Sequence, residues 1–575
     1  MLNYRTFFIR TNITHFLVFY LKNKDQREDI MSKTNQLKSQ DELDAPLPSH
    51  KAYIVRNYKT VTREQRERIL KETEYNMFSF PADLLYLDYL SDSGTTSMTD
   101  LQWAALMLGD ESYGRNRGYY VLLEAFRDTF ERGEHPLRPL DLIMKGEEST
   151  QLLMEELYLK SYEGGFVNGG KYQLMRPNTF ICPQGRVAEH LLFSTLAEIL
   201  HEIDPSKHYA IPNNGHFDTT GANIRAVNID PINVFDKKVV LEPFRVEDTP
   251  NSNPFKGNMD VAQLETIIQE RGADSIPLIY LTITNNSVAG QPVSMANIKE
   301  VKSIADKYNI PLFFDACRFA ENAYFIKQYE DGYGDKSVKS IVQEMFSYAD
   351  GFTISLKKDG LANMGGALFL RDNGVFVQKY SLNGKNVGIR IKEKQIVTIG
   401  NDSYGALSGR DIMALTMGLY EVVKESYLKA RIGLTQYFAA ELGKRDIPVI
   451  LPPGGHAVYI DMDRFLEGTD LTTEDFGGVG FTIELLRHYG IRACELGPFA
   501  FEWDQRSPEE RKGILNFVRF AIPRNAYTKA DIDYTVAAIT ELYKNKHIIP
   551  KVRISRGREL SLRHFQSGLE PVYRT

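Results

Sequence analysis

The chain has 575 residues, of which 43% are hydrophobic, 11% aromatic and 25% charged, a composition typical of globular proteins rather than of disordered or fibrous ones. At about 150 residues per domain, the length allows four domains, or two in a large α/β enzyme. The 69 basic and 75 acidic side chains give a formal net charge of −6, so no basic excess indicates a nucleic-acid partner. We therefore expect a small-molecule partner and no nucleic acid.

The cysteines and the apolar runs favour a cytoplasmic protein. Cys182, Cys317 and Cys494 are too few and too scattered for a disulfide framework, and none lies in a C-x-x-C pair. The longest apolar stretch, residues 15–21, is far shorter than the roughly 20 residues of a membrane span. We expect a reducing compartment and no contact with a membrane.

Residues 1–51 are predicted to be a flexible N-terminal extension. The segment from Met1 to Lys22 carries Arg5, Arg10 and Lys22 but no acidic residue, which resembles an organelle-import segment. The alternative, which we prefer, is an upstream extension ahead of a start at Met31, where a polar tail begins. Organelle import stays open.

Three further parts follow the extension. Residues 52–98 are predicted to form an N-terminal arm and part of a small domain, residues 99–420 a large domain, and residues 421–575 a small C-terminal domain. Within the large domain, residues 134–175 contain two glycine pairs and are predicted to be a loop-rich insertion.

The central part of the chain alternates strands and helices. Residues 277–284 and 310–315 are apolar runs typical of buried strands, and residues 295–308 between them place their apolar side chains on one helical face. Such a βαβ unit implies a parallel sheet covered by helices. Further short strands are predicted at 208–211, 238–241, 351–355 and 366–370, and a long helix at 411–427 leads into a second unit that contains residues 454–460. The fold class is therefore α/β, with a mostly parallel sheet in the large domain and a smaller α/β domain.

Ligands of such sheets bind beyond the carboxyl ends of the strands, and a lysine and an aspartate lie there. Lys358 follows the strand that ends at Ile354; partial desolvation at this place favours the neutral amine that forms a Schiff base, although a lysine pair is usually solvated. Asp315 ends its own strand. It is suited to pair with the protonated ring nitrogen of pyridoxal phosphate, or else to cap a helix or pair with Arg318.

Five other residues are candidates with open alternatives. Gln184-Gly185-Arg186 precedes a helical pattern and is suited to bind phosphate, but Arg186 is equally compatible with a surface position. Phe217 follows a short strand and suits either a planar ring or the core. Strand alternation places Arg519 on the face opposite Val518, where it either grips a carboxylate or faces solvent.

Several strings of this sequence closely resemble the β-eliminating lyases of aromatic amino acids, and the likeness spans roughly Tyr53 to Phe565. The strings are Leu90–Thr95, Gly109–Tyr113, Gly290–Asn297, Asp315–Lys327, Met345–Asp350, Ser355–Asp359, Tyr404–Asp411 and Arg519–Pro523.

The resemblance implies a fold-type I, aspartate aminotransferase-like pyridoxal phosphate enzyme, a homotetramer with active sites at dimer interfaces and an amino-acid substrate. It implies that Lys358 forms the Schiff base and Asp315 pairs with the ring nitrogen. It further implies that Phe217 stacks on the ring, that Asn286 and Arg318 lie near its phenolic oxygen, and that the phosphate is held by Gln184, Gly185, Arg186, Ser355 and Lys357. The substrate carboxylate would be bound by Arg519, with Ser91 and Ser93 nearby, and Tyr113 would be an acid in the neighbouring subunit's site. A monovalent cation, K⁺, would be bound by Gly94, Glu111 and Asn363.

Three positions bear on which side chain leaves. Asp218, Leu496 and His564 follow the tryptophan-cleaving form of their strings, where the tyrosine-cleaving form has threonine, arginine and phenylalanine. An apolar Leu496 cannot donate to a phenolate. We therefore expect tryptophan to be cleaved to indole, pyruvate and ammonia, with Asp218 and His564 assisting proton movement. Cleavage of tyrosine or of another amino acid is the alternative, and a cofactor-binding regulatory protein without turnover is the alternative of another class.

The sequence departs from the family pattern in places that bear on the pocket. Val187, Ala289 and Leu356 replace smaller residues and are expected to add bulk near the cofactor. The insertion at 134–175 and extra length between Arg371 and Asp402 are expected to remodel the substrate entrance.

Overall fold

The computed structural model describes residues 50–51, 56–131, 139–146, 149–242 and 253–573, with residues 139, 142, 144 and 146 described by their backbone only. The predicted extension, residues 1–51, thus lies outside the described residues except for His50 and Lys51, and so does the import segment. The fold below belongs to the compact unit that begins at Ala52.

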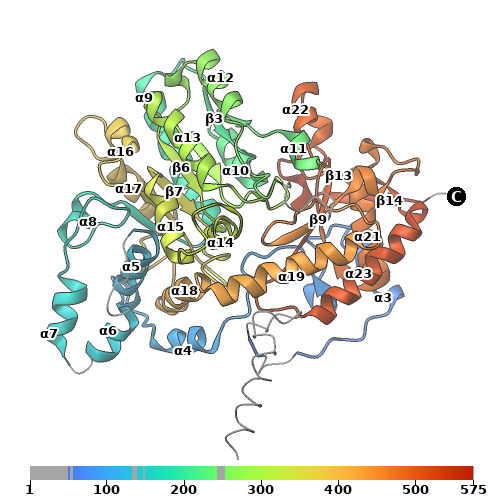
Figure 1. The fold of residues 1–575 in the computed structure, drawn as a ribbon, viewed down its shortest axis with the longest axis horizontal. Helices are drawn as coiled ribbons and strands as arrows, with labels where there is room; N and C mark the ends of the chain where they lie inside the picture. The colour runs from blue at the N-terminus through green and yellow to red at the C-terminus, as the bar shows by residue number, and fades with distance from the viewer. Residues whose placement is uncertain (1–49, 52–55, 132–138, 147–148, 243–252, 574–575) are drawn as a thin grey trace, which may run out of the picture. The chain divides into compact units, whose positions relative to one another are not determined.

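A seven-stranded sheet organises the large domain (Figure 1). Its strands, in the spatial order β2-β8-β7-β6-β5-β3-β4, are β2 (Thr179–Cys182), β8 (Gly366–Leu370), β7 (Gly351–Ile354), β6 (Leu312–Asp315), β5 (Ile279–Thr282), β3 (Tyr209–Asn213) and β4 (Ile229–Asn233). Only β8 runs antiparallel to its neighbours. The predicted mostly parallel α/β sheet is confirmed, and the carboxyl ends of the other six strands meet at one edge.

Helices cover both faces of this sheet, because both faces are apolar. Alternate strand side chains, such as Phe313 and Leu368, pack on one face against α9 (Gly185–Ile203), α10 (Asp218–Arg225), α16 (Val375–Tyr380) and α17 (Val387–Ile399). The other face, with Phe314 and Phe369, packs against α5 (Arg117–Phe130), α12 (Val261–Arg271), α13 (Met295–Lys307), α14 (Phe319–Tyr329), α15 (Val338–Ser347) and α18 (Gly409–Val422). Burial on both faces explains why these strands are continuous apolar runs in the sequence.

The small domain is built around an antiparallel sheet in the order β11-β12-β9, formed by β9 (Ala457–Asp461), β11 (Cys494–Leu496) and β12 (Phe517–Ala521). Around it lie α3 (Arg63–Glu72), α19 (Glu425–Gly443), α20 (Met462–Phe465), α21 (Gly477–Tyr489), α22 (Pro508–Gly513) and α23 (Lys529–Lys544), and the strand pairs β1 (Leu87–Asp88) with β10 (Ile491–Arg492) and β13 (Lys551–Arg556) with β14 (Gly568–Val572). Short turns of helix complete it at η2 (Ala82–Leu84), η6 (Thr473–Asp475), η7 (Trp503–Gln505), η8 (Lys546–Ile548) and η9 (Arg563–Phe565). Because β1 pairs with β10, the segment before residue 98 contributes to the small domain.

The long helix α19 connects the two domains. Its first half places Leu428 and Ile432 in the core of the large domain, and its second half places Phe438 and Leu442 in the core of the small domain. Figure 1 shows it running between them. The helix predicted at 411–427 is in fact two helices, because α18 ends at Val422 and α19 begins at Glu425.

Two further predictions of secondary structure are wrong. Residues 237–241 form the helix α11 (Lys237–Leu241) rather than a strand, since the side chain of Asp236 caps it by accepting a hydrogen bond from the Lys238 N–H (2.8 Å). The predicted loop-rich insertion contains helical segments: α6 (Pro139–Gly146), α7 (Thr150–Leu153), η3 (Met154–Tyr158) and α8 (Lys171–Met175).

The insertion packs next to α5, where Ile143 and Leu157 share a small core with Val121 and Met417. The helix α4 (Asp100–Leu108) packs against α18 in the same region, and η5 (Ala273–Ser275) precedes β5. In the part of the chain that the structure describes, no helix combines the length and the apolarity that crossing a membrane requires.

Candidate active site

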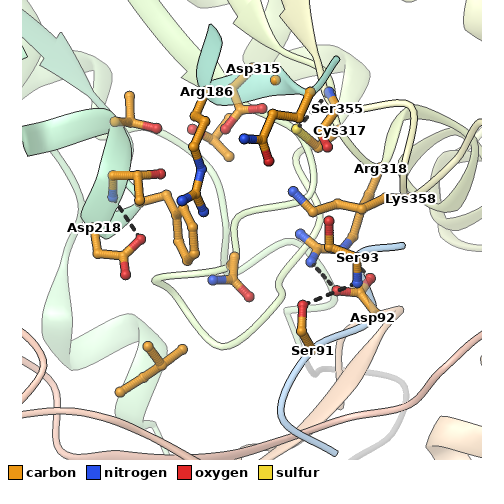
Figure 2. Close-up of a pocket in the computed structure, with 18 of the residues that line it drawn as sticks. Ser91, Asp92, Ser93, Arg186, Asp218, Asp315, Cys317, Arg318, Ser355 and Lys358 are labelled. Carbon is orange, nitrogen blue, oxygen red and sulfur yellow. Dashed lines mark hydrogen bonds and ion pairs between the residues drawn. The ribbon is translucent and has the colours of Figure 1, made fainter. Parts of the chain in front are cut away.

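A pocket lies where the carboxyl edge of the large sheet meets the small domain and the N-terminal arm (Figure 2). Residues that follow β2, β3, β5, β6 and β7 line it, as expected for an open α/β sheet. Most of the candidate residues of the sequence analysis are among them: Ser91, Ser93, Gln184, Gly185, Arg186, Phe217, Asp218, Asn286, Asp315, Arg318, Ser355, Lys358, Leu496, Arg519 and His564. The fold therefore brings together side chains that are up to several hundred residues apart in the sequence.

One end of the pocket is suited to bind a phosphate. Gln184 is the N-cap of α9 and makes no side-chain hydrogen bond to it, so the helix begins at the pocket, lined there by Gln184, Gly185 and Arg186, without a side-chain cap. A Cβ on Gly185 would lie 2.8 Å from Ser355 Cβ, so only glycine permits the close approach of this turn to Ser355. The side chain of Arg186 lines the same end. The 19-residue helix, the arginine and the serine together form an anion site.

Lys357 is not among the residues that line the pocket. Its side chain packs against the turn at Gly94, where a Cβ would lie 2.8 Å from Lys357 Cε. Burial, followed by the positive charges of Arg186 and Lys358, lowers the pKa of Lys357. The side chain of Lys357 thus lies beside the pocket, within electrostatic range of Arg186, and its role at the phosphate stays a prediction.

The middle of the pocket presents an acceptor and an amine. Asp315 ends β6, is 6% exposed, and its Oδ1 accepts no hydrogen bond from the described residues. Lys358 lies in the turn after β7 and extends into the pocket from the side opposite Asp218. A buried carboxylate oxygen needs a donor, and the protonated ring nitrogen of pyridoxal phosphate is such a donor. The phosphate site, the acceptor and the lysine thus fit this cofactor.

Arg519 lies in β12, and its side chain points into the end of the pocket that would hold the substrate. Its Nη1 donates to Asn286 Oδ1 (2.9 Å) and its Nη2 donates to the Leu90 carbonyl (2.7 Å), while its buried Nε has no partner among the described residues. These two bonds fix the guanidinium plane, which is the geometry that bidentate binding of a carboxylate requires.

His456 and Tyr459, which the sequence analysis missed, position Asn286. Tyr459 Oη donates to Asn286 Oδ1 (2.9 Å), and His456 Nε2 lies 2.8 Å from the same oxygen. Burial, followed by the charge of Arg318, holds the pKa of His456 well below its usual value, so the imidazole is neutral and its Nε2–H is the donor. Both residues belong to the segment around β9, and only its closeness in the fold reveals their role.

On the opposite wall, His564 and Asp218 form a buried pair with 2.8 Å between Nε2 and Oδ2. Burial raises the pKa of Asp218, but the hydrogen bond and the charge of His564 outweigh it, and the net pKa lies below the usual value. Phe565 and Phe78 pack on the His564 ring, with centroids 4.2 and 5.6 Å away. The apolar Leu496 lines the same region, so a polar pair faces an otherwise apolar wall.

Glu189 is a further carboxyl group in the pocket, and the sequence analysis missed it. It lies one turn after Gly185 on α9 and accepts a hydrogen bond from Thr220 Oγ1 (2.5 Å). Burial and then the negative charge of Asp315 raise the pKa of Glu189 to about 8. Its position one turn into a phosphate-binding helix was the signal in the sequence that could have indicated it.

Tyr113 lies outside this pocket. It is 76% exposed and stacks on Tyr404, with ring centroids 4.0 Å apart. The insertion reaches this loop, because Arg115 Nη1 donates to Gln173 Oε1 (2.6 Å). Within the described ranges, neither the insertion nor residues 371–402 line the pocket, so the expected remodelling of the entrance is not seen within one chain.

The three departures from the family pattern do not line the pocket either. Leu356 is fully buried in the core of the large domain, Ala289 packs under the small domain, and Val187 packs against the core beneath α9. Leu356 and Ala289 point into packed interior and Val187 is half-buried beside the core, so the expectation that the three add bulk in the pocket is wrong.

The proposed cation ligands are only partly together. Asn363 Nδ2 donates to the carbonyls of Gly94 (3.0 Å) and Thr96 (3.2 Å), whereas the carboxylate of Glu111 pairs with Arg410 (3.0 Å). Gly94 and Asn363 thus lie in contact, whereas Glu111 pairs with Arg410 instead. Among the described residues, no cluster of three or more His, Cys, Asp or Glu side chains suited to a metal occurs.

The chain resembles known proteins over most of its length. The model of the β-eliminating lyase family matches residues 88–538. The chain is 37% identical to a tryptophanase of Salinibacter ruber over 89% of this chain and 92% of that protein, and 34% identical to a tyrosine phenol-lyase of Symbiobacterium thermophilum over 91% and 98%. Among solved structures, an aspartate aminotransferase of Thermotoga maritima matches 84% of this chain and 98% of its own, with 13% identity and a TM-score of 0.47.

Proposed function

The chain belongs to the β-eliminating lyase family, and on this premise we propose that it converts L-tryptophan and water to indole, pyruvate and ammonia. Membership confirms the predicted class, a pyridoxal phosphate-dependent lyase of the tryptophanase and tyrosine phenol-lyase type. Membership and the sheet order together confirm the predicted fold-type I architecture. The proposal concerns the finer question of which amino acid is cleaved.

The residues of the pocket divide the work of such an elimination. Bound pyridoxal phosphate supplies an electron-withdrawing ring that makes the α-proton of an amino acid acidic. Gln184, Gly185, Arg186 and Ser355 would hold its phosphate, and Asp315 would accept the hydrogen bond of its ring nitrogen.

Arg519 and Lys358 act on the substrate. The guanidinium of Arg519, held by Asn286 and the Leu90 carbonyl, binds the α-carboxylate and so orients the α-carbon. The amine of Lys358 then takes the α-proton. Both groups line the same pocket, as this division of roles requires.

The Asp218–His564 pair beside Leu496 is the observation that supports tryptophan. Cleavage of the bond between the β-carbon and indole requires a proton at the indole carbon that leaves, and an imidazole held by a carboxylate is suited to deliver it. Leu496 offers no donor to a phenolate oxygen, so it does not support tyrosine as substrate.

A product assay tests the proposal. Purified protein is incubated with pyridoxal phosphate, a potassium salt and either L-tryptophan or L-tyrosine, and indole, phenol and pyruvate are measured. We expect indole and pyruvate in equal amounts from tryptophan and little phenol from tyrosine. Phenol without indole would make tyrosine the substrate, and pyruvate from neither would favour a regulatory protein that binds the cofactor without turnover.

We also propose that the enzyme works as a homotetramer in which Tyr113 completes the site of a neighbouring subunit, and that K⁺ supports its activity. The exposure of Tyr113 outside its own pocket supports the first point. The closeness of Gly94 and Asn363, whose backbone carbonyl lies beside Gly94, supports the second, because carbonyl oxygens are ligands that hard cations prefer.

A further inference from the structure

A fully buried cluster of ion pairs lies directly behind the cofactor lysine, with Arg524 at its centre. Arg524 is 0% exposed and bonds to three carboxylates from three separate segments. Its Nη1 lies 2.9 Å from Asp92 Oδ2, and its Nη2 lies 2.8 Å from Asp359 Oδ1 and 2.9 Å from Glu321 Oε1. One guanidinium thus connects the N-terminal arm, the turn that carries Lys358 (the lysine turn) and α14.

Through Asp359 the cluster reaches the residue next to Lys358 in the chain. The second oxygen of Asp359 accepts the N–H groups of Ala320 (2.8 Å) and Glu321 (3.3 Å) at the start of α14. Asp359 thereby connects the turn that carries Lys358 both to α14 and to Arg524.

Through Asp92 the cluster reaches the substrate end of the pocket. Asp92 lies between Ser91 and Ser93, which line the pocket, and it pairs with Arg318 through both of its oxygens (2.8 and 3.0 Å). Two residues earlier, the carbonyl of Leu90 accepts the hydrogen bond from Arg519 (2.7 Å). A continuous path of hydrogen bonds and covalent bonds therefore links Arg519 to Lys358.

The origin of Arg524 explains why this path spans both domains. Arg519 lies within β12 of the small domain, and Arg524 follows shortly after the end of this strand. The Ile522 carbonyl between them accepts a hydrogen bond from Arg431 (2.6 Å), which also pairs with Glu321 (3.3 Å). One strand of the small domain thus presents one arginine to the substrate site and another to the back of the lysine turn.

Buried ion pairs are weak evidence for stability, because desolvation offsets their attraction, whereas they often define a unique geometry. We propose that Arg524 is a positioning residue for the elimination reaction: it fixes the separation between the carboxylate-binding Arg519 and the amine of Lys358. This inference rests on the proposed function. It concerns the distance between the guanidinium that binds the substrate carboxylate and the amine that takes the α-proton.

The variant Arg524→Lys tests it, because lysine keeps the charge but cannot bond to three carboxylates in fixed directions. We expect kcat/KM for the amino-acid substrate to fall on the order of 100-fold, since a displacement of about 1 Å has this effect on a reaction. We also expect an altered absorption spectrum of the lysine-bound cofactor and a cofactor dissociation constant raised about tenfold. Asp359→Asn, which leaves Arg524 paired with Asp92 and Glu321, is the second variant should Arg524→Lys fail to fold.

Arg492→Lys is the matched control. Arg492 is also buried and pairs with Asp88 (2.6 Å) while it donates to the carbonyls of Met77 and Phe80, but it has no contact with the lysine turn. If Arg524 has only a structural role, both variants lower the melting temperature and leave kcat/KM and the spectrum of the folded holoenzyme unchanged; this result would overturn the proposal. If the unaltered protein cleaves no amino acid, the proposed function fails, and the spectrum and the cofactor dissociation constant still decide whether Arg524 positions Lys358.

Discussion

His564 Nε2 and Asp218 Oδ2 are 2.8 Å apart and both side chains are buried, although Asp218 begins a helix of the large domain and His564 lies near the C-terminus. Burial alone would raise the pKa of Asp218, and its net pKa is nevertheless low because of His564. The hydrogen bond to Asp218 fixes the orientation of the His564 imidazole in the pocket, so His564 does more than fill space there.

The first prediction concerns this pair. Asp218→Asn and His564→Phe should each lower the turnover of tryptophan about 100-fold, and the double variant should be no slower than the slower single variant, because the two residues act as one unit. Indole release measures the effect. The control substrate is β-chloro-L-alanine, whose chloride leaves without a proton; an equal loss on this substrate would show that the pair has another role.

The second prediction concerns Arg519. Arg519→Lys should raise the KM for tryptophan by at least about tenfold, because an ammonium cannot bind a carboxylate through two parallel hydrogen bonds. The variant should also lose much of the preference for tryptophan over tryptophanamide, which lacks the carboxylate. Steady-state kinetics with both compounds measure this, and a variant that keeps the preference would place the carboxylate elsewhere.

The third prediction concerns the pH dependence of stability. The pKa of Glu189, raised to about 8 by burial and Asp315, lies above its value in the unfolded chain, so the folded state binds the extra proton between the two values. The stability that this proton contributes is present at low pH and is lost as the pH rises toward 8.

Glu189→Gln, which keeps the shape but cannot titrate, should remove this dependence. Relative to the variant, the free energy of unfolding of the unaltered protein should fall by up to about 1.4 kcal/mol for each pH unit between the two pKa values. Denaturant unfolding of the cofactor-free proteins at pH 5 to 9 measures it. Parallel pH profiles for the two proteins would mean that Glu189 is ionised throughout.

The fourth prediction concerns Tyr113. If its side chain completes a neighbouring subunit's site, Tyr113→Phe and Lys358→Ala should each be nearly inactive alone, while a mixture reassembled from both should regain activity. With random pairing, about half of the dimers contain one subunit of each variant. Each of these dimers has one intact site of two, so about a quarter of full activity is expected. Indole release before and after reassembly measures it. A mixture that stays inactive would place Tyr113 in its own chain's site, and an active Tyr113→Phe variant would place it outside catalysis.

Much of the fold was predictable from local patterns, and the errors have local causes. The strands at 279–282, 312–315 and 366–370 are apolar on both faces and were found as continuous apolar runs. Residues 238–241 also contain an apolar run, Val239–Leu241, but a capping aspartate in front of them makes a helix. Short apolar runs do not distinguish the two, because periodicity needs more residues than such a run contains.

The sequence by itself determined the chemistry: Lys358 and Asp315 follow buried strands, and their residue types and positions already indicate a cofactor site, since parallel strands bring their carboxyl ends to one edge. Only the tertiary structure decided which distant residues support that chemistry. The pairing of His564 with Asp218, of Asn286 with His456, and of Arg524 with Asp92 and Asp359 depends on how the small domain packs against the sheet. Such contacts leave no periodic signal in the chain, because each one is made between segments that approach only after both domains have folded.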